Sequence, residues 1–388
     1  MTPTATGPVA PTAPARPSDA LSAQTLKDML YSMLLIRRFE ERTMQNYQQA
    51  HIGGFCHIYI GQEATAVGSI GAALPDDPLI TAYRDHGHAL ARGMHPNYAM
   101  AEMFGKLTGC AKGKGGSMHF FDRPHAMFGG HAIVGGQCPM GLGLAWGIQY
   151  NRENKVCLCY LGDGALNQGA FLESLNFAAV FNLPILFVLE NNGYSMGTDI
   201  ARGTAMAHEL AAKAEANGIR YAECDGQDLL ATYDCFAREI ARTRGARPIN
   251  FNERTNRRET LPTYRREGRT PGPAFINVKT YRYQGHSMSD PQKYRNKDEV
   301  ESRGGGKDSP VDCINRLVNH IIDRGYANQS VIDSLDDRAK AAANEAVRFA
   351  KDSPETPLSE LYTDVYSQPF GPFLQGAQPD IVTNPECK

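Results

Sequence analysis

Two polar side chains that follow apolar runs of the sequence could bind a metal ion. Asp163 stands between two glycines, and Asn192 stands between Asn191 and Gly193. One carboxylate, one amide oxygen and a nearby backbone carbonyl form a hard, sparsely charged oxygen site. Such a site suits Mg²⁺, which keeps waters and substrate phosphates as further ligands. The alternative is that both positions are ordinary turns, because Gly and Asn are common turn residues.

The elements around these two residues are predicted to bring them to one edge of a sheet. Short apolar runs at 156–161 and 185–189 indicate buried strands. Between them, residues 169–181 have helical spacing and place Phe171, Leu172, Leu175 and Ala178 on one face. This βαβ unit requires parallel strands, and α/β proteins bind ligands at the carboxyl ends of such strands. We therefore expect Asp163 and Asn192 to lie close together.

Further elements are predicted on both sides of this unit. Residues 22–50 have the pattern of an amphipathic helix with Ser22 as its N-cap, and strands are indicated at 220–223 and 274–280. Helices are indicated between about 310 and 353. Their predicted inward-facing side chains are Leu317, Val318, Ile321 and Ile322.

Composition excludes several classes of protein. The chain has 388 residues and a net charge of -2, which gives no reason to expect nucleic-acid or membrane binding, and it holds no apolar run of bilayer length. Its nine scattered cysteines are interpreted as reduced thiols, mostly in the core, of a cytoplasmic protein. Residues 1–20 are rich in Pro, Ala and Thr and have neither signal nor transit character, so a flexible tail is expected.

Several blocks of the sequence together resemble one enzyme family. They are GGFCHIYIGQEA (53–64), LITAYRDHG (79–87), CAKGKGGSMHF (110–120), IVGGQCPMGLG (133–143), GDGALNQGAFLESLNFAAVFNLPILFVLENNGYSMGT from residue 162, and TYRYQGHSMSDP (280–291). In this order they resemble the alpha subunits of two-subunit, thiamine-diphosphate-dependent 2-oxoacid dehydrogenases, from about residue 25 to about 365. The resemblance implies an α/β thiamine-diphosphate-binding fold, with helices on both faces of a parallel sheet. The implied domain covers 21–366, followed by a C-terminal tail at 367–388.

The resemblance also implies roles for individual residues. Asp163 and Asn192 would bind Mg²⁺ through their side chains, and Tyr194 would bind it through its backbone carbonyl. The implied thiamine diphosphate site comprises His57, Tyr83, Arg84, Ala132, Val134, Asp163, Gly164, Ala165, Asn192, Tyr194, Arg282 and His286. Of these, His286 and His57 are the implied catalytic residues.

Three of these residues have plainer interpretations. Arg84 could form a surface ion pair with Asp85, because such pairs are common and weak. His286 could be a structural histidine or a solvated loop residue, and His57 could be a lone structural histidine. For Arg84 the functional interpretation is favoured by charge, because its planar guanidinium matches phosphate oxygens.

The family assignment implies partners and a substrate. The implied partners are a beta subunit, in an α₂β₂ heterotetramer with the cofactor site between subunits, and the lipoyl-bearing dihydrolipoamide acetyltransferase. TYRYQGHSMSDP resembles pyruvate-specific alpha subunits more than other members of the family. The alternatives are a branched-chain 2-oxoacid or acetoin dehydrogenase subunit, and a non-catalytic scaffold subunit.

Two segments depart from the family pattern. Ser287 matches a position that is phosphorylated in mitochondrial relatives, but Asp199 and Lys293 replace two other such positions. Together with an N-terminal segment that lacks transit character, this departure indicates a bacterial-type enzyme with an unmodified Ser287. The Arg-rich segment 247–271 is longer than in relatives. It is interpreted as a solvated surface loop, with contact to a subunit or to the core of the complex as the alternative.

Overall fold

A six-stranded, all-parallel sheet forms the centre of the computed structural model, which describes residues 15–246, 251–252, 257–258, 271–306 and 309–364. Its strand order is β2-β1-β3-β4-β10-β7. The strands are β1 (Leu79–Ala82), β2 (Met127–His131), β3 (Cys157–Gly162), β4 (Ile185–Asn191), β7 (Arg220–Asp225) and β10 (Ala274–Lys279). The predicted βαβ unit is confirmed, because β3 and β4 pair in parallel and are linked by α6 (Gly169–Phe181).

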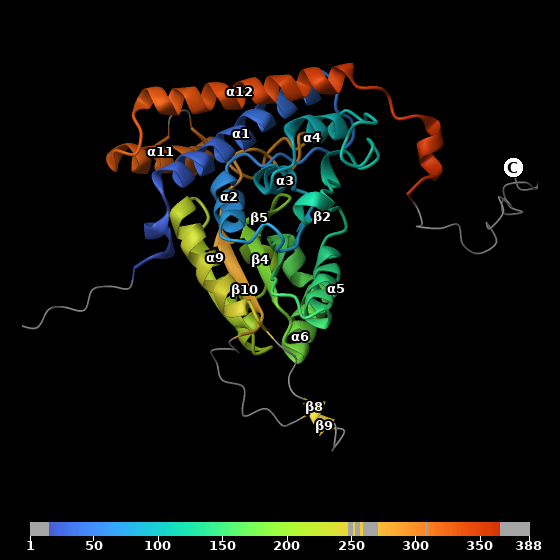
Figure 1. Cartoon of the computed structure of the whole chain (residues 1–388), viewed down its shortest axis with the longest axis vertical. Coiled ribbons are helices and arrows are strands. Elements are labelled where there is room, and N and C mark those ends of the chain that lie inside the picture. The colour runs from blue at the N-terminus through green and yellow to red at the C-terminus, as the bar shows by residue number, and fades with distance from the viewer. Residues whose placement is uncertain (1–14, 247–250, 253–256, 259–270, 307–308, 365–388) are drawn as a thin grey trace, which may run out of the picture.

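Helices cover both faces of the sheet, as predicted (Figure 1). The core on one face is shared by α1 (Ala23–Gln48), α2 (Glu63–Gly71), α3 (His86–Arg92), α4 (Pro96–Met103), α9 (Leu229–Thr243), α11 (Cys313–Asp323) and α12 (Gln329–Asp352). Of these helices, α9 contacts β4, β7 and β10, whereas α12 packs on α1 and α4. The other face packs against α5 (Gln137–Tyr150), α6 and α8 (Ala211–Glu215). Alternate β3 residues point to opposite faces: Leu158 and Tyr160 enter the first core, whereas Cys157, Cys159 and Leu161 enter the second.

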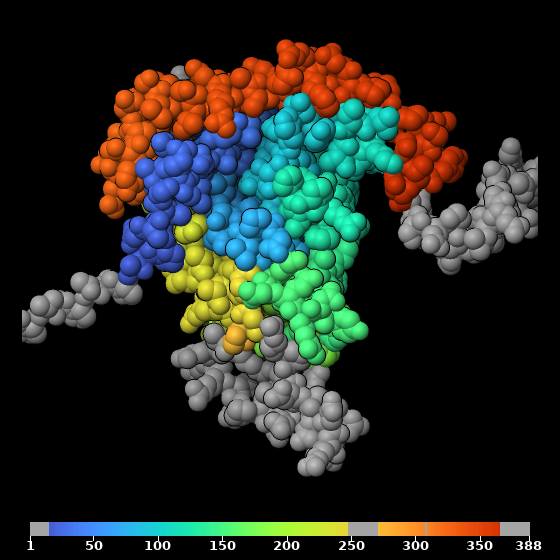
Figure 2. All heavy atoms as spheres, in the orientation of Figure 1, coloured from blue at the N-terminus to red at the C-terminus, as the bar shows by residue number. Residues whose placement is uncertain are grey.

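The long helices α1 and α12 lie side by side across one end of the molecule, as the blue and red surfaces of Figure 2 show. The predicted N-cap of α1 is confirmed, since the Ser22 hydroxyl accepts a hydrogen bond of 3.0 Å from the Thr25 amide. The short elements include β5 (Tyr194–Ser195), β6 (Thr198–Asp199), α7 (Ile200–Gly203), β8 (Phe251–Asn252), β9 (Arg257–Arg258), α10 (Lys297–Val300), and one-turn helices at Pro17–Ala20, Gly116–Met118, Arg123–His125, Asp163–Asn167, Glu301–Gly305 and Leu358–Tyr362.

Two predicted core positions are wrong. Leu172 on α6 is 42% exposed and Ile322 on α11 is 36% exposed, although both were expected to face inward. Each helix buries a narrower stripe than its apolar pattern suggests, with Leu175 and Leu317 at the centres of these stripes. Apolar residues beside the stripe therefore remain at the surface.

The chain segments outside the central domain are only partly described. Residues 17–20, expected to belong to a flexible tail, form a one-turn helix, and the Ser18 amide donates a hydrogen bond of 2.6 Å to buried Asp234. The cysteines of the described residues are free and mostly buried, in line with the prediction of reduced core thiols. No helix in the described ranges is both long and apolar enough to cross a membrane. Most of the Arg-rich segment 247–271, and the tail 367–388, lie outside the described residues.

Candidate functional site

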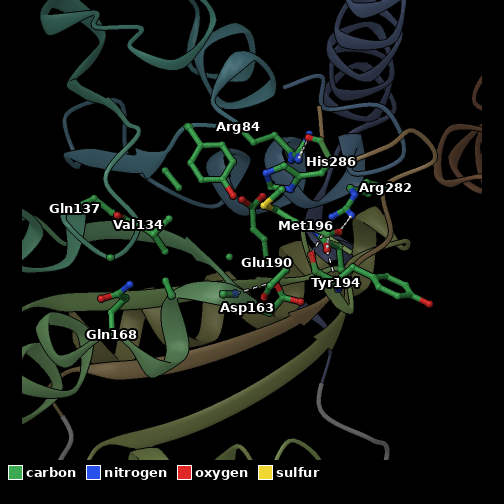
Figure 3. A pocket seen from close by; sticks show the side chains of 18 of the residues that line it. Arg84, Val134, Gln137, Asp163, Gln168, Glu190, Tyr194, Met196, Arg282 and His286 are labelled. Atoms are coloured by element: carbon green, nitrogen blue, oxygen red, sulfur yellow. Dashed lines mark hydrogen bonds between the residues drawn. The ribbon is translucent and has the colours of Figure 1, made fainter. Parts of the chain in front are cut away.

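The carboxyl ends of β3 and β4 open into a cavity of about 280 Å³ (Figure 3). Asp163 directly follows β3, and Asn192 directly follows β4. Gly162 and Glu190 are paired across the two strands, so the residues that follow them emerge at the same edge. The prediction that Asp163 and Asn192 come together is confirmed, because both line this cavity.

The Asp163 carboxylate has one satisfied and one unsatisfied oxygen. Its Oδ1 accepts hydrogen bonds from the Gly164 amide at 2.9 Å and the Ser195 hydroxyl at 3.3 Å. Its Oδ2 is buried and has no partner within the described residues. Burial raises the pKa of Asp163 to about 6, although the positive charge of Arg282 acts in the opposite direction. A cation beside Oδ2 would both satisfy this oxygen and keep the carboxylate ionised.

The other two expected metal ligands share one donor. Arg282 Nη1 donates to Asn192 Oδ1 at 3.2 Å and to the Tyr194 carbonyl at 2.9 Å. Asn192 Oδ1 and the Tyr194 carbonyl oxygen thus both point to the guanidinium of Arg282. Two oxygens that share one positive group in this way could also share a metal ion. The described residues contain no cluster of three or more His, Cys, Asp or Glu side chains suited to a metal. Any metal here would therefore rely on the mixed set of carboxylate, amide and carbonyl oxygens.

Arg282 and Arg84 bring two buried guanidinium groups to this edge of the sheet. Arg282 is 1% exposed, and its Nη2 donates to the Met196 carbonyl at 2.6 Å and to the Tyr294 hydroxyl at 2.8 Å. Its Nε is buried without a partner in the described part of the chain. The lining also holds the carboxylates of Asp163 and Glu190, so the site combines groups that can bind an anion with groups that can bind a cation.

Arg84 connects two segments that carry histidines. Its Nη1 donates to the Ile58 carbonyl and its Nη2 to the His286 carbonyl, both at 2.6 Å. The alternative of a surface pair with Asp85 is wrong, since Arg84 is buried and the Asp85 carboxylate instead accepts the Phe120 amide at 2.9 Å. The guanidinium therefore has a structural role as well as a charge directed to the cavity.

Three aromatic rings meet at one side of the cavity. The His57 ring centroid lies 4.6 Å from that of Tyr83 and 5.1 Å from that of His286. Burial, followed by the charge of Arg84, lowers the pKa of His57 to about 2 and that of His286 to about 3. Both rings are therefore neutral at physiological pH. The Nδ1 atom of each is buried and has no partner within the described residues, so each can still form a hydrogen bond with a ligand.

The loop that carries Arg282 and His286 is held by Asp290. One Asp290 oxygen accepts from the His286 amide and from the Tyr294 hydroxyl, both at 2.6 Å. Because Tyr294 also accepts from Arg282, one carboxylate connects both cavity residues. Ser287, in the same loop, is half-buried, and its hydroxyl lies 3.5 Å from that of Ser289.

Ten of the twelve expected cofactor residues line the cavity: Tyr83, Arg84, Val134, Asp163, Gly164, Ala165, Asn192, Tyr194, Arg282 and His286. His57 and Ala132 do not, although His57 contacts two residues that do. Sequence reasoning missed seven side chains that also line it: Gln62, Ala82, Gln137, Gln168, Glu190, Ser195 and Met196. Glu190 could have been found, because it is the penultimate residue of β4, close to Asn192. Gln62 and Gln137 carry no local signal.

Comparison with known proteins identifies the family. The chain belongs to the dehydrogenase E1 component family, whose model matches residues 31–258 and 262–359. The chain is 43% identical over 334 residues to the pyruvate dehydrogenase E1 component subunit alpha of Rickettsia prowazekii, covering 86% of this chain and 93% of that protein. The corresponding protein of Rhizobium meliloti is 40% identical over 333 residues, with coverages of 86% and 87%. The mitochondrial alpha-1 subunit of Arabidopsis thaliana is 36% identical over 353 residues, with coverages of 90% and 82%. The resemblance inferred from the sequence blocks is confirmed.

Proposed function

We propose that this chain is the alpha subunit of the first component of a pyruvate dehydrogenase complex. It catalyses the thiamine-diphosphate-dependent oxidative decarboxylation of pyruvate and the transfer of the acetyl group to the lipoyl group of dihydrolipoamide acetyltransferase. The observation that carries the proposal is the cavity at the ends of β3 and β4. An Asp163 oxygen that has no partner among the described residues shares its lining with two buried arginines. The names of the relatives supply the substrate.

The residues of this cavity fit a diphosphate together with Mg²⁺. Asp163 Oδ2, Asn192 Oδ1 and the Tyr194 carbonyl would hold the metal, and Arg84 and Arg282 would neutralise the diphosphate. The amides of Gly164 and Ala165 begin a one-turn helix that leaves the edge of the sheet, where backbone N–H groups favour anions. When bound, thiamine diphosphate supplies the carbanion that attacks the 2-oxo carbon and the electron sink for loss of CO₂.

The chain's own side chains would then orient the reactants. The lowered pKa values of His57 and His286 keep both rings neutral, so each would donate or accept a hydrogen bond at the reacting group. The Tyr83 ring contacts both histidines and limits their rotation. Burial of these three rings lowers the local water content, which strengthens each electrostatic interaction in the cavity.

A beta subunit completes the assembly. The surface of α5 and α6 exposes large apolar side chains, which single chains seldom leave uncovered. They are Met140 at 43%, Trp146 at 47%, Leu172 at 42% and Phe177 at 48%. This face extends to Ile133 and Val134, next to the cavity, so a subunit that covers it also reaches the cofactor site. This face supports the proposed contact with a beta subunit, and we propose an α₂β₂ heterotetramer with shared sites as the assembly.

The proposal is tested by pyruvate-dependent dye reduction with thiamine diphosphate and Mg²⁺. The full chain is assayed alone and after mixing with candidate beta subunits. Activity with pyruvate only in the mixture supports both the chemistry and the shared site. Activity with a branched-chain 2-oxoacid or acetoin instead would replace the substrate, and inactivity with every substrate and subunit would contradict the proposal.

A further inference from the structure

The segment that carries His57 depends on side chains for its shape. Residues 55–59 form neither helix nor strand, and the backbone bonds that they make are isolated ones: the Cys56 carbonyl accepts from the Met288 amide at 2.9 Å, and the Tyr59 carbonyl accepts from the Gln62 amide at 3.2 Å. The His57 amide donates to Ser117 Oγ at 3.2 Å, and the Tyr59 amide donates to Glu40 Oε1 at 2.6 Å. Arg84 binds the carbonyl of the intervening residue, as described above. Three consecutive residues are thus each held by a different side chain.

A buried histidine joins the two amide anchors. His86 Nδ1 lies 3.0 Å from both carboxylate oxygens of Glu40, and His86 Nε2 lies 2.8 Å from Ser117 Oγ. Glu40 and His86 are fully buried, and Ser117 is 3% exposed. The chain Glu40–His86–Ser117 therefore runs behind the histidine segment without reaching the cavity. It brings together α1, α3 and the one-turn helix at Gly116–Met118.

The electrostatics of this chain favour a charged His86. Burial acts against ionisation, but the Glu40 carboxylate leaves the pKa of His86 raised above its ordinary value. A doubly protonated ring donates from both nitrogens, to Glu40 on one side and to Ser117 on the other. Its positive charge is also one of the influences that lower the pKa of His57. The pair thus holds Ser117 in place and helps to keep His57 neutral.

We propose that His86 is a positioning residue for His57, acting through Ser117 and with Glu40 as its counter-ion. The proposal deepens the proposed function and rests on it, because His57 is assigned there to the reacting carbon. His86 itself touches neither the cavity nor Tyr83. Its effect on the reaction must therefore pass through the position of the histidine segment or through the charge that it places near His57, and this distinguishes it from a general contribution to stability.

The first test measures hydrogen–deuterium exchange of the full chain in peptides that cover residues 55–59. In His86→Asn the shorter amide can still donate to Glu40 but no longer reaches Ser117, so exchange in this segment should accelerate about five-fold, the equivalent of one lost hydrogen bond. In His86→Gln the longer amide reaches Ser117, and exchange should stay within about two-fold of the native rate by the same reasoning. The matched control is Thr243→Val, which removes a buried hydrogen bond from Arg220 at the opposite edge of the sheet. Acceleration of residues 55–59 by the control as well, or by neither His86 variant, would overturn the proposal.

The second test is a double-mutant cycle on the turnover number of the full chain assembled with its beta subunit. His86→Asn should lower kcat by about ten-fold or more in the native background, because a misplaced catalytic group slows the reaction. In a His57→Ala background the same substitution should change kcat by less than about two-fold, since the two effects are not additive. Equal losses in both backgrounds would contradict a role through His57. Failure of the native assembly to turn over pyruvate would count against the proposed function alone, because the exchange experiment does not depend on activity.

Discussion

The buried Asp163 carboxylate is expected to destabilise the folded chain when no cation is bound to it. Its carboxylate is 3% exposed, and burial raises its pKa to about 6 from the ordinary 3.8. Because the folded state binds this proton more tightly than the unfolded state, Asp163 has little effect on stability below pH 4. Without a cation, the destabilisation grows as the pH rises from about 4 to about 6. By linkage it reaches about 3 kcal/mol at pH 7.

The substitution Asp163→Asn removes this charge and keeps the shape of the side chain. In the presence of a chelator at pH 7, we expect the free energy of unfolding to rise by up to about 3 kcal/mol, and we expect the gain to vanish near pH 4. Urea unfolding of the full chain at several pH values measures both effects. Asp290→Asn is the matched contrast: hydrogen bonds hold the pKa of Asp290 below its ordinary value despite burial, so its substitution should destabilise the protein at pH 7.

The Asp163→Asn variant should also fail to gain stability when the cofactor and Mg²⁺ are added. Thiamine diphosphate with Mg²⁺, at about one hundred times the dissociation constant, should stabilise the native chain by about 2.7 kcal/mol. The variant should show no such increase, because its only carboxylate ligand is gone. The reasoning would be refuted by an Asp163→Asn variant that is no more stable than the native chain at pH 7 in chelator, or by a gain of equal size at pH 4.

Three further predictions concern other parts of the molecule. Arg84→Lys should destabilise the chain by about 1 to 3 kcal/mol in urea unfolding, because one ammonium group cannot reach both carbonyl oxygens that the guanidinium binds. Unchanged stability would show that these two hydrogen bonds do not stabilise the fold. Trp146 is the single tryptophan, so ¹⁹F NMR of the fluorotryptophan-labelled chain should show its resonance shift when a beta subunit binds, and Trp146→Ser should weaken assembly by about 2 kcal/mol; a resonance that does not move would place the interface elsewhere. Ser18→Ala removes the hydroxyl bond of 3.0 Å to Asp234 and should lower stability by about 1 kcal/mol, as measured by the urea midpoint, with exposed Ser289→Ala as the neutral control.

The local pattern of apolar residues was sufficient to predict the βαβ unit at the centre of the fold. The apolar runs before Asp163 and Asn192 predicted two strands, and the helix between them required a parallel pair, so their meeting at one edge followed without knowledge of the rest of the chain. The same local reasoning found the N-cap at Ser22. It failed at Leu172 and Ile322, because a helical pattern shows which side chains are apolar but not how wide a stripe its neighbours cover.

The sequence by itself determined the βαβ unit, which depends on residue types at short spacing, and the family, which depends on ordered blocks of residues. About half of the residues that line the cavity followed, most of them from the resemblance to that family. Only the tertiary structure decided how these residues are supported. Arg84 binds carbonyl groups 26 and 202 positions away, and His86 joins Glu40 to Ser117, which stand 46 and 31 positions from it. Such contacts are set by the packing of separate helices and loops against one sheet, and no periodicity along the chain records which of them will meet.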